Sequence, residues 1–147
     1  MIEERSAGAV VYREHNGNIH FLLLNYPTGH WDFPKGKIEK DELTLETVKR
    51  EVLEETGIQN LEIIPNFKRN IVYYYHRNAG MVHKEVIYVL ARTFTTDITL
   101  SHEHKDYVWL KLEEAINKVT YKNSKNTLIA AAKFLNELPI HPDESFL

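Results

Sequence analysis

The sequence predicts an α/β fold in which helices cover both faces of a mixed β-sheet. Three observations lead to this prediction. Short β-rich runs recur along the chain, with glycine or asparagine between several of them. Three other segments have the apolar spacing of helices, and these fall both between and after the strands. No linker-like composition and no repeat interrupts the chain, so we expect residues 1–147 to form a single domain.

The predicted strands are six runs of β-branched, aromatic and aliphatic residues. Turn-forming residues separate several of them, which favours strands that follow one another in a sheet. The runs are Ala7 to Arg13, Ile19 to Tyr26, Leu61 to Asn66, Phe67 to His76, Val86 to Phe94 and Tyr107 to Leu110.

Three segments are predicted to be helices. The first is Thr44 to Thr56, followed by Gly57 where a glycine commonly ends a helix, and the second is the shorter Leu112 to Lys118. The third lies near the C-terminus, ahead of Pro139. The apolar positions are Leu45, Val48 and Val52 in the first helix and Leu128, Ala131, Ala132, Leu135 and Leu138 in the third.

Composition excludes several classes of protein. Eighteen Lys and Arg against 21 Asp and Glu give a net charge of −3, and this balance disfavours a DNA-binding module. The absence of cysteine excludes disulfides, Cys-ligated zinc and a thiol nucleophile. No apolar run approaches the roughly 20 residues of a membrane span, and the acidic start is unlike a signal peptide. We therefore expect a cytoplasmic protein without a membrane partner.

Three glutamates crowd one side of the predicted Thr44 to Thr56 helix. At about 100° per residue, Glu51, Glu54 and Glu55 form a stripe beside the apolar one. Like charges at this spacing repel, and a negative charge is unfavourable at the C-terminal end of a helix. A divalent cation such as Mg²⁺, which prefers oxygen ligands, would offset this charge. The alternative is a solvated acidic face.

The residues around these glutamates form a longer pattern. From Gly36 to Ile58 the chain reads GKIEKDELTLETVKREVLEETGI, and all nine specified positions match the Nudix box. The segment therefore resembles that of the Nudix hydrolases. The resemblance implies a Nudix fold, an α/β/α sandwich around a mixed sheet, and hydrolysis of a nucleoside diphosphate linked to another moiety.

The resemblance also implies roles for residues of the box. Glu51, Glu54 and Glu55 would bind divalent metal ions, with the Gly36 carbonyl as a further ligand, and Arg50 would orient the glutamates. Glu42 would brace the preceding loop. We expect Mg²⁺, with Mn²⁺ as the alternative, because such ions neutralise phosphate charge and acidify water.

Segments outside the box resemble the asymmetrical bis(5′-nucleosyl)-tetraphosphatases, which hydrolyse diadenosine tetraphosphate. This likeness implies that an adenine lies between Tyr73 and Tyr121 and that His30, Lys35 and Lys84 contact the phosphates. The substrate would be a dinucleoside polyphosphate, cleaved to ATP and AMP by a monomer. The similar segments are Phe67-Lys68-Arg69 with Tyr73, Lys84 to Tyr88, and Ser101 to His104 with Tyr107 and Trp109.

Some alternatives remain open. Strand alternation places Tyr73 and Tyr75 on one side of their strand and Tyr74 on the other, and which of the three stacks on the adenine is open. Ordinary packing is the alternative role for Tyr73 and Tyr121. Glu103, between two histidines, would be a further metal ligand or a general base by the same likeness. The His-Glu-His run also fits zinc, but no third ligand has suitable spacing.

Two other functions compete with asymmetrical hydrolysis. An RNA 5′ pyrophosphohydrolase has a similar run of Trp, Pro, Lys and Gly leading into the box. Such an enzyme should carry a basic groove for RNA, which a net charge of −3 disfavours. A Nudix-like binding module without turnover is a second alternative. Such modules typically lose the box glutamates, whereas this chain keeps all three.

Overall fold

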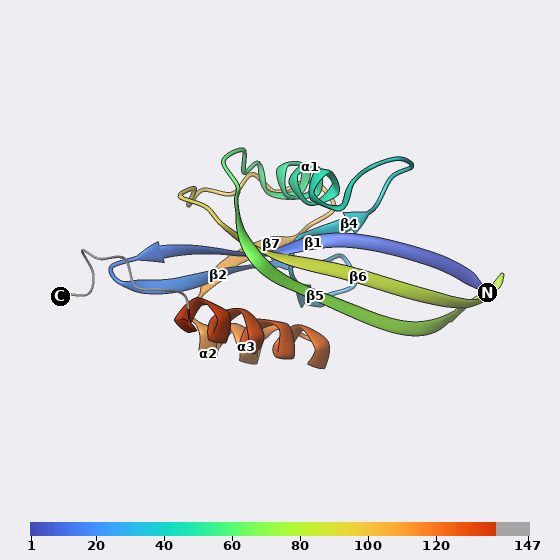
Figure 1. The fold of residues 1–147 in the computed structure, drawn as a ribbon. Coiled ribbons are helices and arrows are strands. Elements are labelled where there is room, and N and C mark those ends of the chain that lie inside the picture. Colours follow the sequence, from blue (N-terminus) through green and yellow to red (C-terminus); the bar gives the residue numbers. More distant parts are fainter. Residues whose placement is uncertain (138–147) are drawn as a thin grey trace.

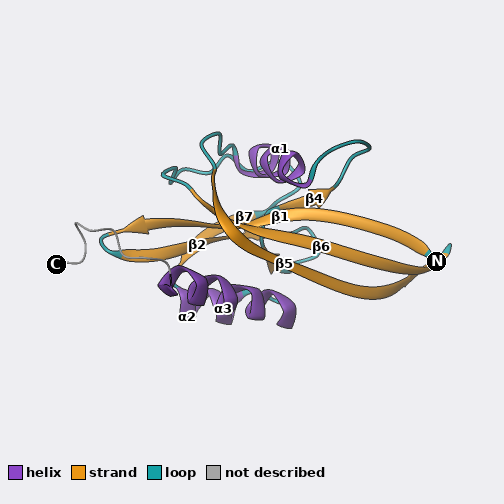
Figure 2. Ribbon diagram, viewed as in Figure 1, coloured by secondary structure: helices purple, strands orange, loops and turns teal. Residues whose placement is uncertain are grey.

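Helices pack against both faces of one seven-stranded sheet in the computed structural model, which describes residues 1–137 (Figure 1). Helix α1 (Thr44–Thr56) lies on one face, and α2 (Leu112–Lys118) and α3 (Lys122–Glu137) lie on the other (Figure 2). The predicted α/β/α sandwich is therefore confirmed. No described helix combines the length and hydrophobicity needed to cross a membrane.

The sheet is mixed, as predicted, because its central strand β1 has neighbours in both directions. β1 runs parallel to β6 and antiparallel to β2 and β4, and the main order is β3-β2-β1-β6-β5. β7 pairs with β2. The strands are β1 (Ile2–His15), β2 (Asn18–Asn25), β3 (Trp31–Asp32), β4 (Lys35–Lys37), β5 (Glu62–Arg77), β6 (Gly80–Arg92) and β7 (Asp106–Leu110).

The strand predictions were wrong in two respects. The runs predicted as separate strands, Leu61 to Asn66 and Phe67 to His76, form the single strand β5. A register shift between Ile64 and Lys68 bends it, and Asn66 has a φ of 71° there. The short strands β3 and β4 were not predicted, because two or three residues carry no periodic pattern.

Helix α1 has the predicted bounds and the predicted end. Gly57 has a φ of 77° and donates its backbone N–H to the Leu53 carbonyl at 2.9 Å, as in a left-handed C-terminal cap. Val48 and Val52 are fully buried, but Leu45, which the apolar spacing also placed in the core, is 45% exposed. The buried side of α1 therefore includes polar residues at its C-terminal end, and Glu55 is one of them.

The core has two halves, one on each side of the sheet. On one side Val48 and Val52 of α1 pack against Val11 and Leu22, and on the other Leu128 and Ala131 of α3 pack in the second cluster. Leu138, which the third helix prediction includes, and Pro139, which that prediction places after the helix, lie outside the described residues. Packing on both faces of the sheet fixes the ends of two loops that carry polar residues. One loop lies between β2 and β4, and the other precedes α3.

Candidate active site

Strand β4 and helix α1 bring the start and the middle of the box together. Gly36 pairs with Ala7 of β1, and its Cα faces the carboxylate of Glu51. A Cβ at position 36 would overlap the Glu51 carboxyl group, so only glycine fits without displacing it. Strand β4 therefore packs closely against the Glu51 side chain of α1 at this position.

Arg50 ties the acidic residues of the loop and helix to one another. Its guanidinium donates to both carboxylate oxygens of Glu42, at 2.7 and 3.0 Å, and to Glu51 at 2.6 Å. It also donates to the Lys37 carbonyl at 3.0 Å and to Glu54 at 3.3 Å. The expected orienting role of Arg50 and bracing role of Glu42 both agree with this arrangement.

Glu42 is the anchor of this network. Besides Arg50, it accepts hydrogen bonds from the Thr47 hydroxyl at 2.5 Å and the Glu39 backbone N–H at 3.1 Å. These bonds, that of Arg50 above all, lower the pKa of Glu42 to about 2. The carboxylate form therefore holds the loop at neutral pH.

We expect Glu42→Gln to lower the thermal stability at neutral pH and to matter less in acid. A carboxyl group with a lowered pKa stabilises the fold above its unfolded pKa and loses that contribution as the pH falls toward its folded pKa, here about 2. The Tm gap between wild type and variant should thus shrink between about pH 6 and pH 3. Thermal melts followed by circular dichroism measure it, and equal gaps at both pH values would contradict the prediction.

Glu55 is a buried carboxyl group that is not fully satisfied. It is 4% exposed, and its Oε1 accepts from the Lys35 backbone N–H at 3.4 Å. Its Oε2 is buried and has no hydrogen-bond partner among the described residues. Burial, then the negative charges of Glu51 and Glu103, raise its pKa to about 8. A cation beside Glu55 would stabilise its carboxylate form and so lower this pKa.

The segment around Glu103 closes the site from another part of the chain. Glu103 itself is exposed, whereas His104 is buried, with its Nε2 3.5 Å from Glu55 Oε1. The Ser101 hydroxyl is 3.0 Å from His104 Nδ1, and burial lowers the pKa of His104. The two histidines of this run thus lie in different environments, and His104 packs at the side of Glu55.

The donor chemistry of this cluster fits a divalent cation, although the ligands are not already gathered. No three His, Asp or Glu side chains within residues 1–137 are grouped closely enough to hold a metal as they stand. The unpartnered Glu55 Oε2 and the mutual repulsion of Glu51, Glu55 and Glu103 nevertheless favour positive charge here. The ligand assignment that the Nudix resemblance implies stays a prediction for this chain.

A cavity of ≈ 570 Å³ adjoins the carboxylates and contains every substrate-contacting residue that the sequence predicted. Lys35 belongs to both regions, because its side chain lines the cavity and its backbone N–H meets Glu55. Tyr26 also borders both, since it lines the cavity and packs edge-on against His104 at 4.6 Å. The lining includes Tyr26, His30, Asp32, Lys35, Ile71, Tyr73, Lys84, Val86, Tyr88, Tyr121 and Ser124.

The aromatic residues are arranged as an open pair at the cavity. Tyr73 and Tyr121, 38% and 48% exposed, come from β5 and from the residue before α3. Tyr75 is on the same side as Tyr73, but its hydroxyl donates to Glu4 at 2.8 Å. Tyr74 packs on His83 and does not line the cavity. Of the three consecutive tyrosines, Tyr73 is therefore the one that lines the cavity.

The predicted phosphate contacts also meet in the cavity. Lys84 lies 3.7 Å from the Glu4 carboxylate, and burial, then nearby positive charges, lower its pKa. His30 stacks on Tyr26 with ring centroids 4.7 Å apart, and burial lowers its pKa. Burial makes the charged form of Lys84 unfavourable, and an anionic ligand in the cavity would stabilise that form.

Sequence reasoning missed two groups in this cavity. Tyr26 is held by a 2.5 Å hydrogen bond to the Phe33 carbonyl and supports the His30 ring. Asp32 is buried and bonded to Lys35 and to Ser124 of α3. Its position three residues before Lys35 was the available signal, but the contact with α3 joins residues 92 apart in sequence.

Comparisons with known proteins identify the family of this chain. The model of the NUDIX domain matches residues 3–132. A protein of Mus musculus named bis(5′-nucleosyl)-tetraphosphatase (asymmetrical) is 40% identical over 147 residues, which covers 92% of this chain and 97% of that protein. An RNA pyrophosphohydrolase of Sulfurovum sp. is 30% identical and covers 65% of this chain and 67% of its own length.

Among solved structures, a C. elegans Ap4A hydrolase binary complex superimposes with a TM-score of 0.82 at 33% identity. It covers 92% of this chain and 99% of that one. The match of the NUDIX model over most of the chain, together with the box on β4 and α1, shows that this protein belongs to the Nudix family.

Proposed function

We propose that this protein hydrolyses diadenosine tetraphosphate asymmetrically, to ATP and AMP. The observation that carries the proposal is the single cavity in which an open tyrosine pair, three cationic or potentially cationic side chains and the border of the glutamate cluster meet. The tyrosine pair would thus bind a base, the cationic side chains would bind the phosphate chain, and the glutamates would lie at the phosphorus that is hydrolysed. The similarity to proteins named for this activity supports the same substrate.

The glutamates would hold the metal ions in this proposal. Glu51, Glu54, Glu55 and Glu103 are the carboxylate ligands, the Gly36 carbonyl is a further one, and we assign Mg²⁺ with Mn²⁺ as the alternative. When bound, such an ion neutralises charge on phosphate oxygens and lowers the pKa of water. Arg50 keeps the Glu51 carboxylate turned toward Gly36.

The remaining residues decide which phosphorus is attacked. Tyr73 and Tyr121 hold one adenine by stacking, and Lys84, His30 and Lys35 contact the phosphates next to it. The ATP half is then the held half, and the fourth phosphorus reaches the glutamates. Water attacks that phosphorus, the bridging P–O bond on the ATP side breaks, and the positive side chains stabilise the charge on the departing ATP.

Product analysis in ¹⁸O-labelled water tests this assignment. With diadenosine tetraphosphate and Mg²⁺, chromatography and mass spectrometry should find ATP and AMP, with the label in AMP. Two molecules of ADP would overturn the asymmetric assignment. Label in ATP would place the attack one phosphorus nearer to the stacked adenine than proposed here.

The same assay distinguishes the other candidate activity. The similarity to an RNA pyrophosphohydrolase makes a triphosphorylated RNA the appropriate competing substrate. We expect a higher kcat/KM for diadenosine tetraphosphate, because the stacking pair and the lysines form a cavity for a small ligand. Failure to turn over either substrate with Mg²⁺ or Mn²⁺ would favour a binding module.

We further propose that residues 1–147 act as a single domain and as a monomer in the cytoplasm, on a free nucleotide rather than on DNA. The single sheet with one core on each face supports the first point. Sedimentation analysis tests the second, and a dimer would contradict it.

A further inference from the structure

Asp32 places a negative charge where the proposed function requires phosphate to bind. It lines the cavity and is 2% exposed, so water solvates its carboxylate very little. A buried carboxylate is costly unless both of its oxygens are paired. Here both are paired, and the partners belong to different parts of the substrate site.

One oxygen of Asp32 holds Lys35. The Lys35 ammonium lies 3.1 Å from Asp32 Oδ2, and its side chain is 19% exposed. A lysine side chain is a flexible stem with a point charge at its end. The ion pair therefore keeps this charge at the wall of the cavity, while the backbone N–H of the same residue donates to Glu55.

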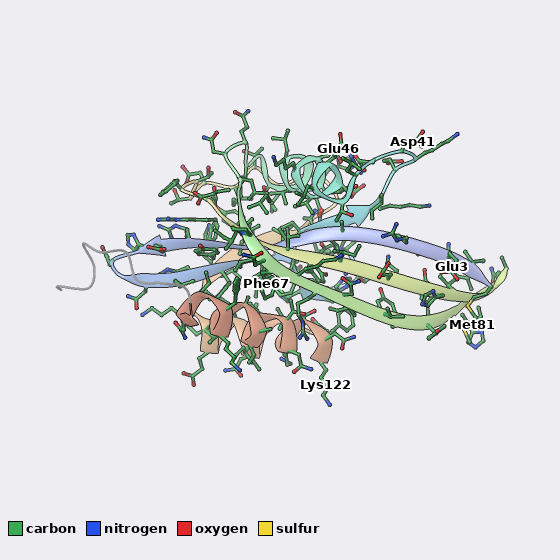
Figure 3. The ribbon with its side chains drawn as sticks, viewed as in Figure 1. Glu3, Asp41, Glu46, Phe67, Met81 and Lys122 are labelled. Carbon is green, nitrogen blue, oxygen red and sulfur yellow. The ribbon has the colours of Figure 1, made fainter. Side chains whose placement is uncertain are left out.

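The other oxygen holds the start of α3. Asp32 Oδ1 accepts from the Ser124 hydroxyl and from the Phe33 N–H, both at 2.9 Å. Ser124 is in the first turn of α3, three residues after Tyr121, and is 3% exposed. In Figure 3 the neighbouring Lys122 marks this start of the helix, below the sheet.

A second pair of bonds holds the other side of Tyr121. The Trp31 backbone N–H donates to the Thr120 hydroxyl at 2.9 Å, and the Thr120 N–H donates to the Trp31 carbonyl at 3.2 Å. The tyrosine ring thus projects from a segment that is bonded to Trp31 on one side and to Asp32 on the other. Tyr121 itself stays 48% exposed, free to meet a ligand.

We propose that Asp32 is a positioning residue whose two carboxylate oxygens separately set the phosphate contact Lys35 and, through Ser124, the base contact Tyr121. This inference rests on the proposed function, because it assigns both contacts to one dinucleotide. Holding two contacts in register by one rigid group lowers the entropy that must be lost in the reacting complex.

The two branches can be separated by substitution. Asp32→Asn keeps an oxygen that can accept from Ser124 and Phe33 and replaces the acceptor of the Lys35 ammonium with an amide donor. Ser124→Ala leaves the ion pair and removes the bond to α3. We expect Asp32→Asn to lower kcat for diadenosine tetraphosphate by about 10–100-fold, the usual size for a group that orients an active-site residue. Ser124→Ala should mainly raise KM.

Double-mutant cycles test whether these effects pass through the assigned partners. In a Lys35→Met background, Asp32→Asn should have no further effect on kcat and should raise Tm, because it removes an unpaired buried charge. In a Tyr121→Ala background, Ser124→Ala should leave KM unchanged. If Lys35→Met does not fold, the Tyr121 cycle still tests the second branch, and kcat of Asp32→Asn against Ser124→Ala tests the first.

A merely structural role predicts different results. It would lower Tm in both single variants and give the same kcat and KM changes whether or not Lys35 or Tyr121 is present, which would overturn the inference. Glu14→Gln is the matched control, since it breaks the 3.7 Å pair with Arg92 outside the cavity lining and should leave kcat and KM unaffected. If wild type itself fails to hydrolyse diadenosine tetraphosphate, the proposed function fails instead, and the two failures are distinct.

Discussion

Glu55→Gln is expected to lower kcat for diadenosine tetraphosphate by roughly 10³–10⁵-fold, the range seen when one charge-stabilising group is removed from a phosphoryl-transfer site. Glu54→Gln should have a comparable effect. Both changes keep the size of the side chain and remove the negative charge that a divalent cation requires. Steady-state kinetics with Mg²⁺ at saturating substrate measures the loss.

The fold should survive the change at position 55. Burial and the charge of Glu51 raise the pKa of Glu55 to about 8, so at neutral pH without a cation the group is protonated. Glutamine resembles that neutral form, and the Tm without a cation should be unchanged or higher. Calorimetric titration with Mn²⁺ should then show weaker binding, which separates loss of a ligand from loss of structure.

Two further substitutions frame this result. Glu103→Gln should be milder, toward the lower end of the about 10²–10⁴-fold range of a single acid-base group, because Glu103 is exposed and peripheral. Glu113→Gln, at an exposed position in the first turn of α2, is the matched control and should retain activity. Wild-type kcat and Mn²⁺ affinity in Glu54→Gln and Glu55→Gln would refute the glutamate site.

Tyr73→Ala and Tyr121→Ala are each expected to raise KM by about 5- to 150-fold, which corresponds to roughly 1–3 kcal/mol of base stacking. The kcat should change little, because stacking is the same in the ground state and the transition state. Steady-state kinetics with diadenosine tetraphosphate measures both parameters.

The same strand supplies the control for this prediction. Tyr74→Ala removes a 58% exposed tyrosine that packs on His83 outside the cavity lining, so KM should stay at the wild-type value. A lower Tm with unchanged KM in both Tyr73→Ala and Tyr121→Ala would show that these rings only pack. Equal KM changes in all three variants would argue against a specific base site.

Local patterns in the sequence determined much of this protein. The bounds of α1, its end at Gly57 and the glutamate stripe were predictable, because helical spacing and a glycine cap act within a few residues. The resemblance to the Nudix box also singled out Gly36, Glu42 and Arg50, and the Arg50–Glu42 contact agrees with the roles expected of those two residues.

Only the tertiary structure decided how these parts meet. It left Leu45 largely exposed, selected Tyr73 among three tyrosines to line the cavity, and joined Asp32 to Ser124 across 92 positions. The short strands β3 and β4 exist because longer neighbours in the sheet complete their hydrogen bonds. Periodicity reports which side of an element is apolar, whereas a cavity depends on where several elements stop, and that is set by packing between residues far apart in sequence.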